Sequence, residues 1–475
     1  MSYKSHQSKA YDLDVTLNKN SRSKLSLAGE DILPRKYSER TITPNKLITI
    51  WFAMAVEITL FMSAAQLYDS LTVLEIIFAC FIGHTLLFSV MWVTQDIGIK
   101  YGISFPVALR PSFGYVGSLI AAYFRAIPAI FWFGFQTWVA ASAINGITNA
   151  IWGLNNLVLW IMVLGVIQIA HTTLGIKAVS RLSNLATPLL LIVGFYILYI
   201  AFTDYGLSFS NVWGMKGTGE GSYSLMYAAM SFMGGWATLS VSIMDITRDC
   251  VSDAEQVKSF KKVMLKYLPP QWIGIIPAVV FYTFIGVIGV ATTGHSNPAE
   301  ILVALSQGHS EIMMVLCLIF IAVATWCTND TANLFPAGYA ISSTFPSKIN
   351  FAKGIIIAGL VGLVSKPWAA ADSLVDVMVI IGNLLAPVAG IMISDYFFLR
   401  KRTINIDALY DADGQYKYWK NINPAAFIAL IVGTIISWPF GDFAFFVGLI
   451  SAAVLYYYMM KLWIIKKYPQ PEIED

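Results

Sequence analysis

The sequence predicts an all-α, polytopic membrane protein with about twelve transmembrane helices. The first observation is composition: hydrophobic residues make up 57% of the 475 residues and charged residues only 12%, and the mean hydropathy is +0.65, far from the balance of soluble domains. The second is length, because at about 20 residues per crossing the chain accommodates roughly a dozen helices. The third is that Lys and Arg gather in every second connection.

Twelve apolar windows define the expected helices, which cross the membrane one after another in alternating directions. The windows are Lys46–Leu67, Val73–Ile97, Gly117–Ile147, Leu157–Leu174, Ser183–Phe202, Tyr223–Ile246, Leu268–Thr292, Glu311–Leu334, Phe351–Trp368, Ser373–Leu399, Asn423–Trp438 and Asp442–Ile465.

The basic residues predict the orientation of these helices. The loops on the side of the N-terminal tail hold nearly all of them, whereas the opposite loops carry little beyond Lys216 and Lys366. By the positive-inside rule we expect a cell (inner) membrane protein with both termini in the cytoplasm, in tails at 1–45 and 466–475. The basic residues on the tail side are Lys100, Arg110, Lys177, Arg181, Arg248, Lys258, Lys261, Lys262, Lys266, Lys348, Lys353, Arg400, Lys401 and Arg402.

The same composition argues against several other classes of protein. Nucleic-acid binding needs a basic stripe, and the sequence shows none. Four scattered cysteines lack metal-ligand spacing and an obvious pairing, so neither a zinc site nor a disulfide framework is expected. No nucleophile–base pair emerges within the helices, which argues against an enzyme. We expect no cofactor and no obligate protein partner.

The first window carries an acid near its middle. The stretch Ile50 to Leu67 reads IWFAMAVEITLFMSAAQL, and it contains Glu57. A carboxylate at that depth costs several kcal/mol unless it faces protein, water or a ligand, so Glu57 predicts a functional site. The alternative is a protonated Glu that hydrogen-bonds a neighbouring helix for packing.

The sixth window contains a break. The run Phe232–Trp236 places Gly234 and Gly235 mid-span, where they weaken the helix and let backbone groups turn toward a ligand. The first window has a candidate break around 56–59. Interrupted helices at matching positions of two halves indicate a transporter built from inverted repeats, each of about five helices here. The alternative is that the glycines allow close helix packing; Trp236, directly after them, favours a site.

The third window combines aromatic rings with an amide. Gln136 follows Trp132 by four residues, so the two share a helix face: the ring offers a flat surface and the amide can hydrogen-bond the edge of a molecule lying on it. A small planar polar heterocycle requires this arrangement. Trp138 in the same run is also explained as an interfacial Trp.

The eighth window ends in an unusually polar run, Ala324–Asn333, which suggests a cation or substrate path. A helix end that emerges into water would look similar, so Asp330 is ambiguous. Four further polar residues lie toward expected helix ends, where snorkelling or interhelical bonding explains them without function. They are Glu75, Arg125, His84 and His171, whereas His295 and His309 fall in an external loop.

Several runs together resemble the nucleobase-cation-symport-1 family, and within it the bacterial hydantoin transporter, over about Leu33 to Lys467. They are IWFAMAVE, LRPSFG, FWFGFQTW, GGWATLSVSIMDI, ATWCTNDTANL and LAPVAGIMISDYFFLRKR. The resemblance implies a LeuT-like fold with alternating access. It places one five-helix repeat at 46–202, an inverted one at 203–399, and a loop with two extra helices at 400–465.

The resemblance also implies roles for individual residues. Trp132 and Trp236 would sandwich a planar substrate, and Gln136, Asn333 and the backbone at Gly235 would hydrogen-bond its edge. Glu57 matches a substrate-contacting position that is Gln in the hydantoin transporter. A sodium site would take carbonyls of Ala53, Val56 and Ala324 and the side chains of Cys327 and Thr328.

The chain departs from the hydantoin transporter at two of these positions. Cys327 stands where that transporter has a Ser hydroxyl, and a neutral thiol is a poor ligand for a hard cation. Glu57 can carry a proton and then offers the donor and acceptor that Gln would supply. Against this, Thr328 and the carbonyls could suffice for weak sodium binding, and an ionised Glu57 could pair with a cationic substrate.

We therefore expect a symporter that imports a hydantoin, allantoin, nucleobase or similar planar heterocycle, with H⁺ favoured over Na⁺ as the coupling ion. The candidates for proton coupling are Glu57 and Asp330. The alternatives are a sodium-coupled carrier of the same substrates, a carrier of a vitamin-like or cationic heterocycle, and a substrate-gated channel, which would show ion currents without saturable uptake.

Overall fold

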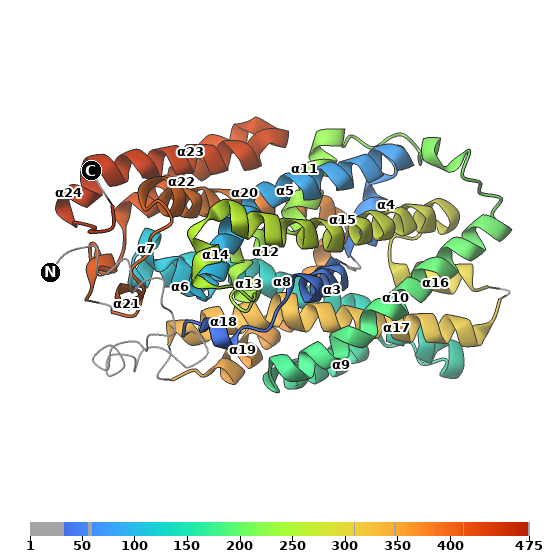
Figure 1. Ribbon diagram of the computed structural model, residues 1–475. Coiled ribbons are helices and arrows are strands. Elements are labelled where there is room, and N and C mark those ends of the chain that lie inside the picture. Colours follow the sequence, from blue (N-terminus) through green and yellow to red (C-terminus); the bar gives the residue numbers. More distant parts are fainter. Residues whose placement is uncertain (1–32, 56–58, 308, 346–347, 412, 474–475) are drawn as a thin grey trace.

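The computed structural model describes residues 33–55, 59–307, 309–345, 348–411 and 413–473, without the side chains of 176–187 and 190. The chain forms helices that run roughly along one direction of the molecule and are joined by shorter segments at its two ends (Figure 1). Within the described residues, six segments are long and apolar enough to cross a membrane, and the bent pair α3–α4 makes a seventh. Three shorter apolar helices complete a multi-pass membrane protein.

Each of the twelve predicted windows holds a helix. Those of the first five windows are α3 (Pro44–Ala55) with α4 (Thr59–Leu67), α5 (Val73–Tyr101), α8 (Tyr115–Trp152), α9 (Leu157–Thr173) and α10 (Ile176–Asp204). The next five are α11 (Leu225–Gly235) with α12 (Ala237–Ser242) and α13 (Met244–Thr247), α15 (Phe260–Thr293), α17 (Glu311–Asn329) with η5 (Asp330–Leu334) and α18 (Phe335–Thr344), α19 (Phe351–Val364), and α20 (Leu374–Ile393) with η7 (Ser394–Leu399). The last two are α22 (Pro424–Ser437) and α23 (Ala444–Met459), continued by η10 (Met460–Ile464) and α24 (Ile465–Lys467).

Short helices fill the connections and lie mostly at the two ends of the molecule. They are η3 (Tyr37–Glu39), α6 (Phe105–Ala108), α7 (Arg110–Phe113), η4 (Val212–Gly214), α14 (Ala254–Lys258), α16 (Pro298–Leu305), η6 (Pro367–Ser373), α21 (Ile406–Leu409), η8 (Gln415–Lys417) and η9 (Trp438–Phe443).

The sixth span is broken at the predicted place, and the first span is a bent pair of helices. The axes of α3 and α4 differ by 54°, and residues 56–58 between them lie outside the described part of the chain. In the sixth span, α11 ends at Gly235 and α12 begins at Ala237, so that Trp236 occupies the break. Such breaks are tolerated at membrane depth where the freed backbone groups face protein or a cavity rather than lipid.

The eighth span differs from its prediction. It was expected to end at Leu334, but the helix continues to Thr344, with a π-helical turn at Asp330–Leu334. The polar run therefore lies inside a long helix instead of emerging at its end. Its threonines bond to carbonyls of the same helix, and Asn329 and Asp330 bond to the neighbouring helices α8 and α9. Such π-turns within α-helices frequently mark functional sites.

Glycines let the central helices approach closely. A Cβ added at Gly83 of α5 would lie 2.2 Å from the carbonyl oxygen of Ala229 on α11, and one at Gly234 would lie 2.0 Å from that of Met378 on α20. Small residues allow this contact between membrane helices. The helices α22 and α23 pack against each other and against α20, at the periphery (Figure 1).

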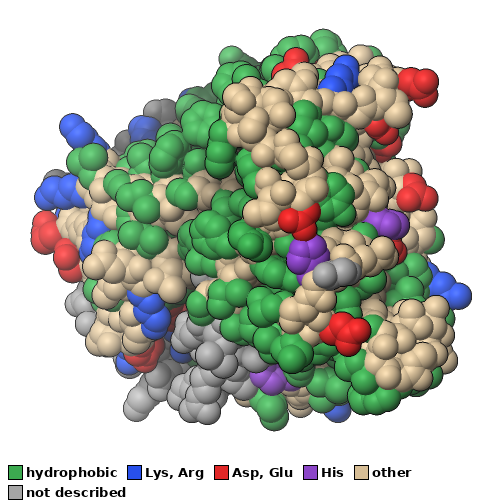
Figure 2. Space-filling view, turned by 90° about the vertical axis from the view of Figure 1, so that its right-hand side faces the viewer, with side chains coloured by type: hydrophobic (Ala, Val, Ile, Leu, Met, Phe, Trp, Pro, Cys, Tyr) green, Lys and Arg blue, Asp and Glu red, His purple; other side chains and the backbone are tan. Residues whose placement is uncertain are grey.

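The end of the molecule with the connections after α10 and α15 carries exposed acidic and histidine side chains beside apolar ones (Figure 2). His295 pairs with Glu300 at 3.3 Å, and His309 with Asp204 at 2.7 Å. Both histidines thus lie on surface segments at this end, as the sequence indicated.

Candidate functional site

The aromatic face of the site comes from α8. Trp132 is 3% exposed, and its Nε1 donor has no hydrogen-bond partner among the described residues. The rings of Phe131 and Phe135 pack against its ring in T-shaped contacts, with centroids 5.3 and 5.9 Å away. Gln136, one turn further on, is buried as well. The predicted pairing of a flat ring and an amide on one face of α8 therefore lies in the interior.

The π-turn η5 contributes Asn333, which a hydrogen-bond network holds in place. The Nδ2 of Asn333 donates to Asn329 Oδ1 at 2.9 Å. Asn329 is fully buried and its Nδ2 donates in turn to the Phe133 carbonyl at 3.0 Å and to Gln168 Oε1 of α9 at 2.7 Å. Thr137 also donates to Gln168, at 3.2 Å. Because Phe133 follows Trp132 directly, this network brings Asn333 to the turn of α8 that carries Trp132 and Gln136.

The second indole occupies the break between α11 and α12. Trp236 is 5% exposed, and its Nε1 has no partner within the part of the chain that the structure describes. The ring of His84, from α5, meets it edge to face at 5.8 Å. His84 Nδ1 lies 2.8 Å from the Cys80 carbonyl, which can only accept, so Nδ1 carries the proton. His84 Nε2 is then an acceptor, buried and unpartnered in the described residues.

Arg125 of α8 forms hydrogen bonds with α12 and with η5. It lies two turns before Trp132 on α8 and is 2% exposed. Its Nε donates to Ser242 Oγ of α12 at 2.9 Å, and its Nη2 donates to the Ala332 carbonyl of η5 at 2.7 Å. Of the two sequence-based explanations for Arg125, interhelical bonding is confirmed and snorkelling is wrong.

The two glycines before Trp236 have different environments. Gly234 faces the backbone of α20, so close packing explains it. A Cβ on Gly235 would instead meet the terminal methyl of Met378, at 2.5 Å, and that flexible side-chain end can move. Close packing is thus confirmed for Gly234, and the site role of Gly235 stays a prediction.

The candidate cation residues are divided between α3 and α17. Ala324, Cys327 and Thr328 lie within about one turn of α17, all buried, and Ala53 lies near the end of α3. The Thr328 hydroxyl donates to the Ala324 carbonyl at 3.3 Å. Two more candidates, Val56 and Glu57, lie outside the described residues. The described residues include no cluster of three or more His, Cys, Asp or Glu that could hold a metal.

Asp330 is a buried group rather than one at a wet helix end. It is fully buried, and its Oδ2 lies 2.7 Å from His171 Nδ1 of α9 and accepts from Trp326 Nε1 at 3.0 Å. Its Oδ1 has no partner in the described chain. A carboxyl that is half-satisfied in this way can take up a proton without breaking its existing contacts.

Sequence reasoning missed three residues of this region. His84 was assigned to a helix end, but it lies eleven residues into α5, beside Trp236. Gln168 and Asn329 form the network behind Asn333, and neither was proposed for the site. Gln168 gave the same signal as Gln136, a lone amide in an apolar helix, whereas the role of His84 depends on a contact 152 residues away in the chain.

The geometry defines a helical membrane protein with buried aromatic and amide side chains on α8, on η5 and at the break between α11 and α12. Comparison with known proteins agrees: the model of the family described as "Permease for cytosine/purines, uracil, thiamine, allantoin" matches residues 34–464. The chain belongs to this family, the nucleobase-cation-symport-1 family, and is therefore a membrane transporter rather than an enzyme.

Individual relatives are similar to this chain over nearly their whole length. The hydantoin permease of Microbacterium maritypicum is 37% identical over 445 residues, covering 94% of this chain and 91% of the relative. The structure of Mhp1, a family transporter in a closed conformation with bromovinylhydantoin bound, superposes with a TM-score of 0.86 at 36% identity, over 94% of this chain and 98% of that one. A Na⁺-coupled sialic acid symporter shares the fold alone, with a TM-score of 0.56 at 13% identity over 97% of each chain. The LeuT-like fold is thereby confirmed.

Proposed function

We propose that this protein imports a planar nitrogen heterocycle of the hydantoin, allantoin or nucleobase class by cation symport. The observation that carries the proposal is the pair of buried indoles, Trp132 and Trp236, whose Nε1 donors have no partner among the described residues. A ring stacked between them, with its amide edge on Gln136, Asn333 and the backbone of Gly235, would complete the site. The similarity to the hydantoin permease supports the substrate class.

Substrate identity is tested by a thermal-shift screen of purified protein against hydantoins, allantoin, uracil, cytosine, purines and vitamin-like heterocycles, because a bound ligand stabilises the folded state. With a hit in hand, Trp132→Ala and Trp236→Ala each remove stacking of about 1 kcal/mol or more and should weaken binding about tenfold. Trp152, at the exposed end of the same helix, provides the matched control Trp152→Ala. Unchanged affinity in both site variants would place the site elsewhere.

We propose further that the coupling ion is a proton rather than sodium. The thiol of Cys327 and the hydroxyl of Thr328, already bonded to the Ala324 carbonyl, make a weak set of ligands for a hard cation. Glu57 in the first span is the first candidate for the proton, and Asp330, with one unpartnered oxygen, is the second. Proton and substrate would then favour each other's binding by the same factor.

The coupling ion is tested by uptake into proteoliposomes under a sodium gradient or a pH gradient imposed separately. Wild type should accumulate substrate under the pH gradient, and Glu57→Gln should lose this accumulation while still binding substrate. Asp330→Asn serves as the second variant and should retain coupling if Glu57 alone carries the proton. Uptake driven by sodium alone and retained in Glu57→Gln would overturn the proposal. Currents without saturable uptake would indicate a channel.

We also infer that both termini are cytoplasmic and that the repeats, 46–202 and 203–399, rock against each other in alternating access. Single-cysteine labelling tests the orientation, because all four native cysteines are buried and burial raises the pKa of the Cys250 thiol in its loop. Lys366→Cys should react with an impermeant maleimide in intact cells. Lys353→Cys should react only after permeabilisation, and the reverse pattern would invert the topology.

A further inference from the structure

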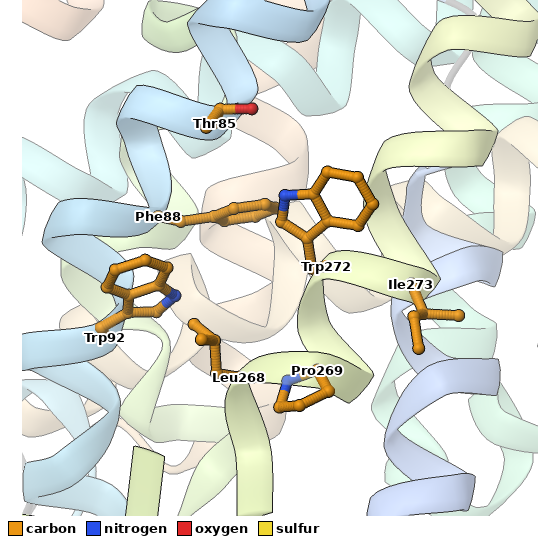
Figure 3. Close-up of a pocket in the computed structure, with 7 residues that line it drawn as sticks. All are labelled: Thr85, Phe88, Trp92, Leu268, Pro269, Trp272 and Ile273. Atoms are coloured by element: carbon orange, nitrogen blue, oxygen red, sulfur yellow. The ribbon is translucent and has the colours of Figure 1, made fainter. Parts of the chain in front are cut away.

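A groove with a volume of about 420 Å³ lies between α5 and α15, away from the site described above. This volume falls within the range of about 300–1,000 Å³ that small-ligand sites occupy. Side chains from both helices project into it (Figure 3). We call it the α5–α15 groove; its lining residues are Thr85, Phe88 and Trp92 from α5, and Leu268, Pro269, Trp272 and Ile273 from α15.

The groove opens on the surface that faces lipid. Both of its helices are membrane spans, and two of its lining side chains, Trp272 and Ile273, are 40% and 52% exposed. Leu265, one turn before Pro269 on α15, is 67% exposed. An apolar depression at this depth has hydrocarbon chains as its neighbours, so the ligand that fits it is an acyl chain.

A positive charge lies at one end of the groove. Lys261 and Lys262 are exposed and form no ion pair within the residues that the structure describes. They precede Leu268 and Pro269 by seven residues, which is about two helical turns and about 10 Å along the same face of α15. That offset is comparable to the roughly 5–8 Å depth of a headgroup layer, so a lipid whose chain fills the groove brings its phosphate to these lysines.

A polar group lies at the same end. Trp92 faces Leu268 and Pro269 across the groove, at the end nearer the lysines, whereas Thr85 lies at the opposite end (Figure 3). The Nε1 of Trp92 is a buried donor that has no acceptor among the described residues. The ester carbonyl of a glycerolipid, between chain and phosphate, supplies such an acceptor at this level.

We propose that the α5–α15 groove binds an anionic glycerophospholipid: one acyl chain lies against Phe88, Trp92 and Trp272, and the phosphate contacts Lys261 and Lys262. Anionic lipid headgroups attract lysines at an adjacent helix end, and salt weakens this attraction. The bound lipid would cover the seam between α5, which carries His84, and α15, which packs along the broken first span. This inference does not depend on the substrate.

Fluorescence quenching by a brominated acyl chain tests the proposal, because bromine quenches an indole on contact. The protein is reconstituted in phosphatidylcholine, and phosphatidylglycerol with brominated chains is added at increasing mole fraction. Wild type should show a saturable component at low mole fraction that brominated phosphatidylcholine does not produce. Trp92→Phe/Trp272→Phe should abolish this component, whereas Trp438→Phe, at an exposed Trp outside the groove, should keep it.

The headgroup contact is tested by charge removal. Lys261→Gln/Lys262→Gln should move the midpoint of the saturable component to higher lipid fractions by about fivefold per lysine. Lys466→Gln/Lys467→Gln removes the same charge at another exposed pair and should leave the midpoint in place. Equal shifts in the two lysine variants, quenching that rises linearly for both lipids, or a saturable component that survives the double Trp variant would each overturn the proposal.

Discussion

Two buried polar regions of this molecule differ in how completely their groups are paired. Arg400 lies at the end of η7, is fully buried, and uses all three guanidinium nitrogens. We call this the Arg400 cluster; its acceptors are Asp395 at 2.8 Å, Glu472, the Pro111 carbonyl at 3.2 Å, Tyr418 at 3.0 Å and Gln470 at 3.0 Å. In the proposed substrate site, by contrast, Trp132 Nε1, Trp236 Nε1 and His84 Nε2 have no partner among the described residues.

The difference distinguishes a region that stabilises the fold from a region that we propose binds substrate. An unpaired buried donor or acceptor costs about 1–3 kcal/mol, and a bound ligand that pairs with it is one way to recover that cost. The Arg400 cluster is complete without a ligand and joins the tenth span to α7 and to the C-terminal segment. We therefore expect changes in the cluster to lower the melting temperature, and changes in the site to lower substrate affinity instead.

The largest expected effect is that of Arg400→Ala. Removing one partner from a buried ionic network leaves Asp395 and Glu472 uncompensated, which destabilises a protein by about 3–5 kcal/mol. The melting temperature should fall steeply, while protein that remains folded binds substrate with wild-type affinity. Lys417→Ala is the control, since it breaks an exposed ion pair with Asp413 worth at most about 1 kcal/mol. A normal melting temperature in Arg400→Ala would contradict the stabilising role of the Arg400 cluster.

The next effect is on substrate binding. Gln136→Leu or Asn333→Leu leaves a buried polar edge of the substrate unpaired, at about 1–3 kcal/mol, so affinity should fall roughly 5- to 150-fold. The melting temperature without substrate should change little. Gln168→Leu sharpens the test, because Gln168 is linked to Asn333 through Asn329 and in the proposed site would affect substrate through these two amides. If the melting temperature collapses and affinity is normal, these amides are packing residues.

Substitutions at Gly234 and Gly235 test whether effects on stability and effects on substrate affinity can be separated at neighbouring residues. Gly234→Ala forces a methyl group against the Met378 carbonyl, and overpacking of this sort costs about 1–3 kcal/mol of stability. Gly235→Ala meets only the flexible end of the Met378 side chain, so its effect on the melting temperature should be smaller, and its main effect should be on affinity. Equal thermal effects in the two variants would show that both glycines serve packing alone.

The sequence predicted features that depend on local pattern. Apolar length located all twelve helical windows, and Gly234–Gly235 located the break before Trp236 because paired glycines weaken a helix wherever they occur. The resemblance to the family proposed Trp132, Trp236 and Asn333, and the structure places all three in buried positions on α8, η5 and the break between α11 and α12.

Features set by tertiary contacts were not predictable. The burial of Asp330 depends on His171 and Trp326. The sequence of a polar run looks the same whether the run is buried or emerges into water. The eighth span continues to Thr344, and two of its polar side chains, Asn329 and Asp330, bond to Gln168 and His171 of α9, which no local pattern could show. Gly234 lies opposite Met378, which is 144 residues later in the chain. Only this contact shows that Gly234 serves helix packing rather than a site.

The smallest expected effect concerns His84, an acceptor that the sequence did not assign to the site. If an unpaired buried atom marks a ligand contact, Nε2 should receive a hydrogen bond in the substrate complex, worth about 0.5–1.5 kcal/mol, or roughly two- to tenfold in affinity. His84→Phe keeps an aromatic edge against Trp236 but removes this acceptor, so affinity should fall by that factor at an unchanged melting temperature. His84→Ala also removes the ring and should weaken binding further. Wild-type affinity in His84→Phe with a loss only in His84→Ala would show that His84 supports the Trp236 ring by packing, and that an unpaired atom next to the site is not by itself a ligand contact.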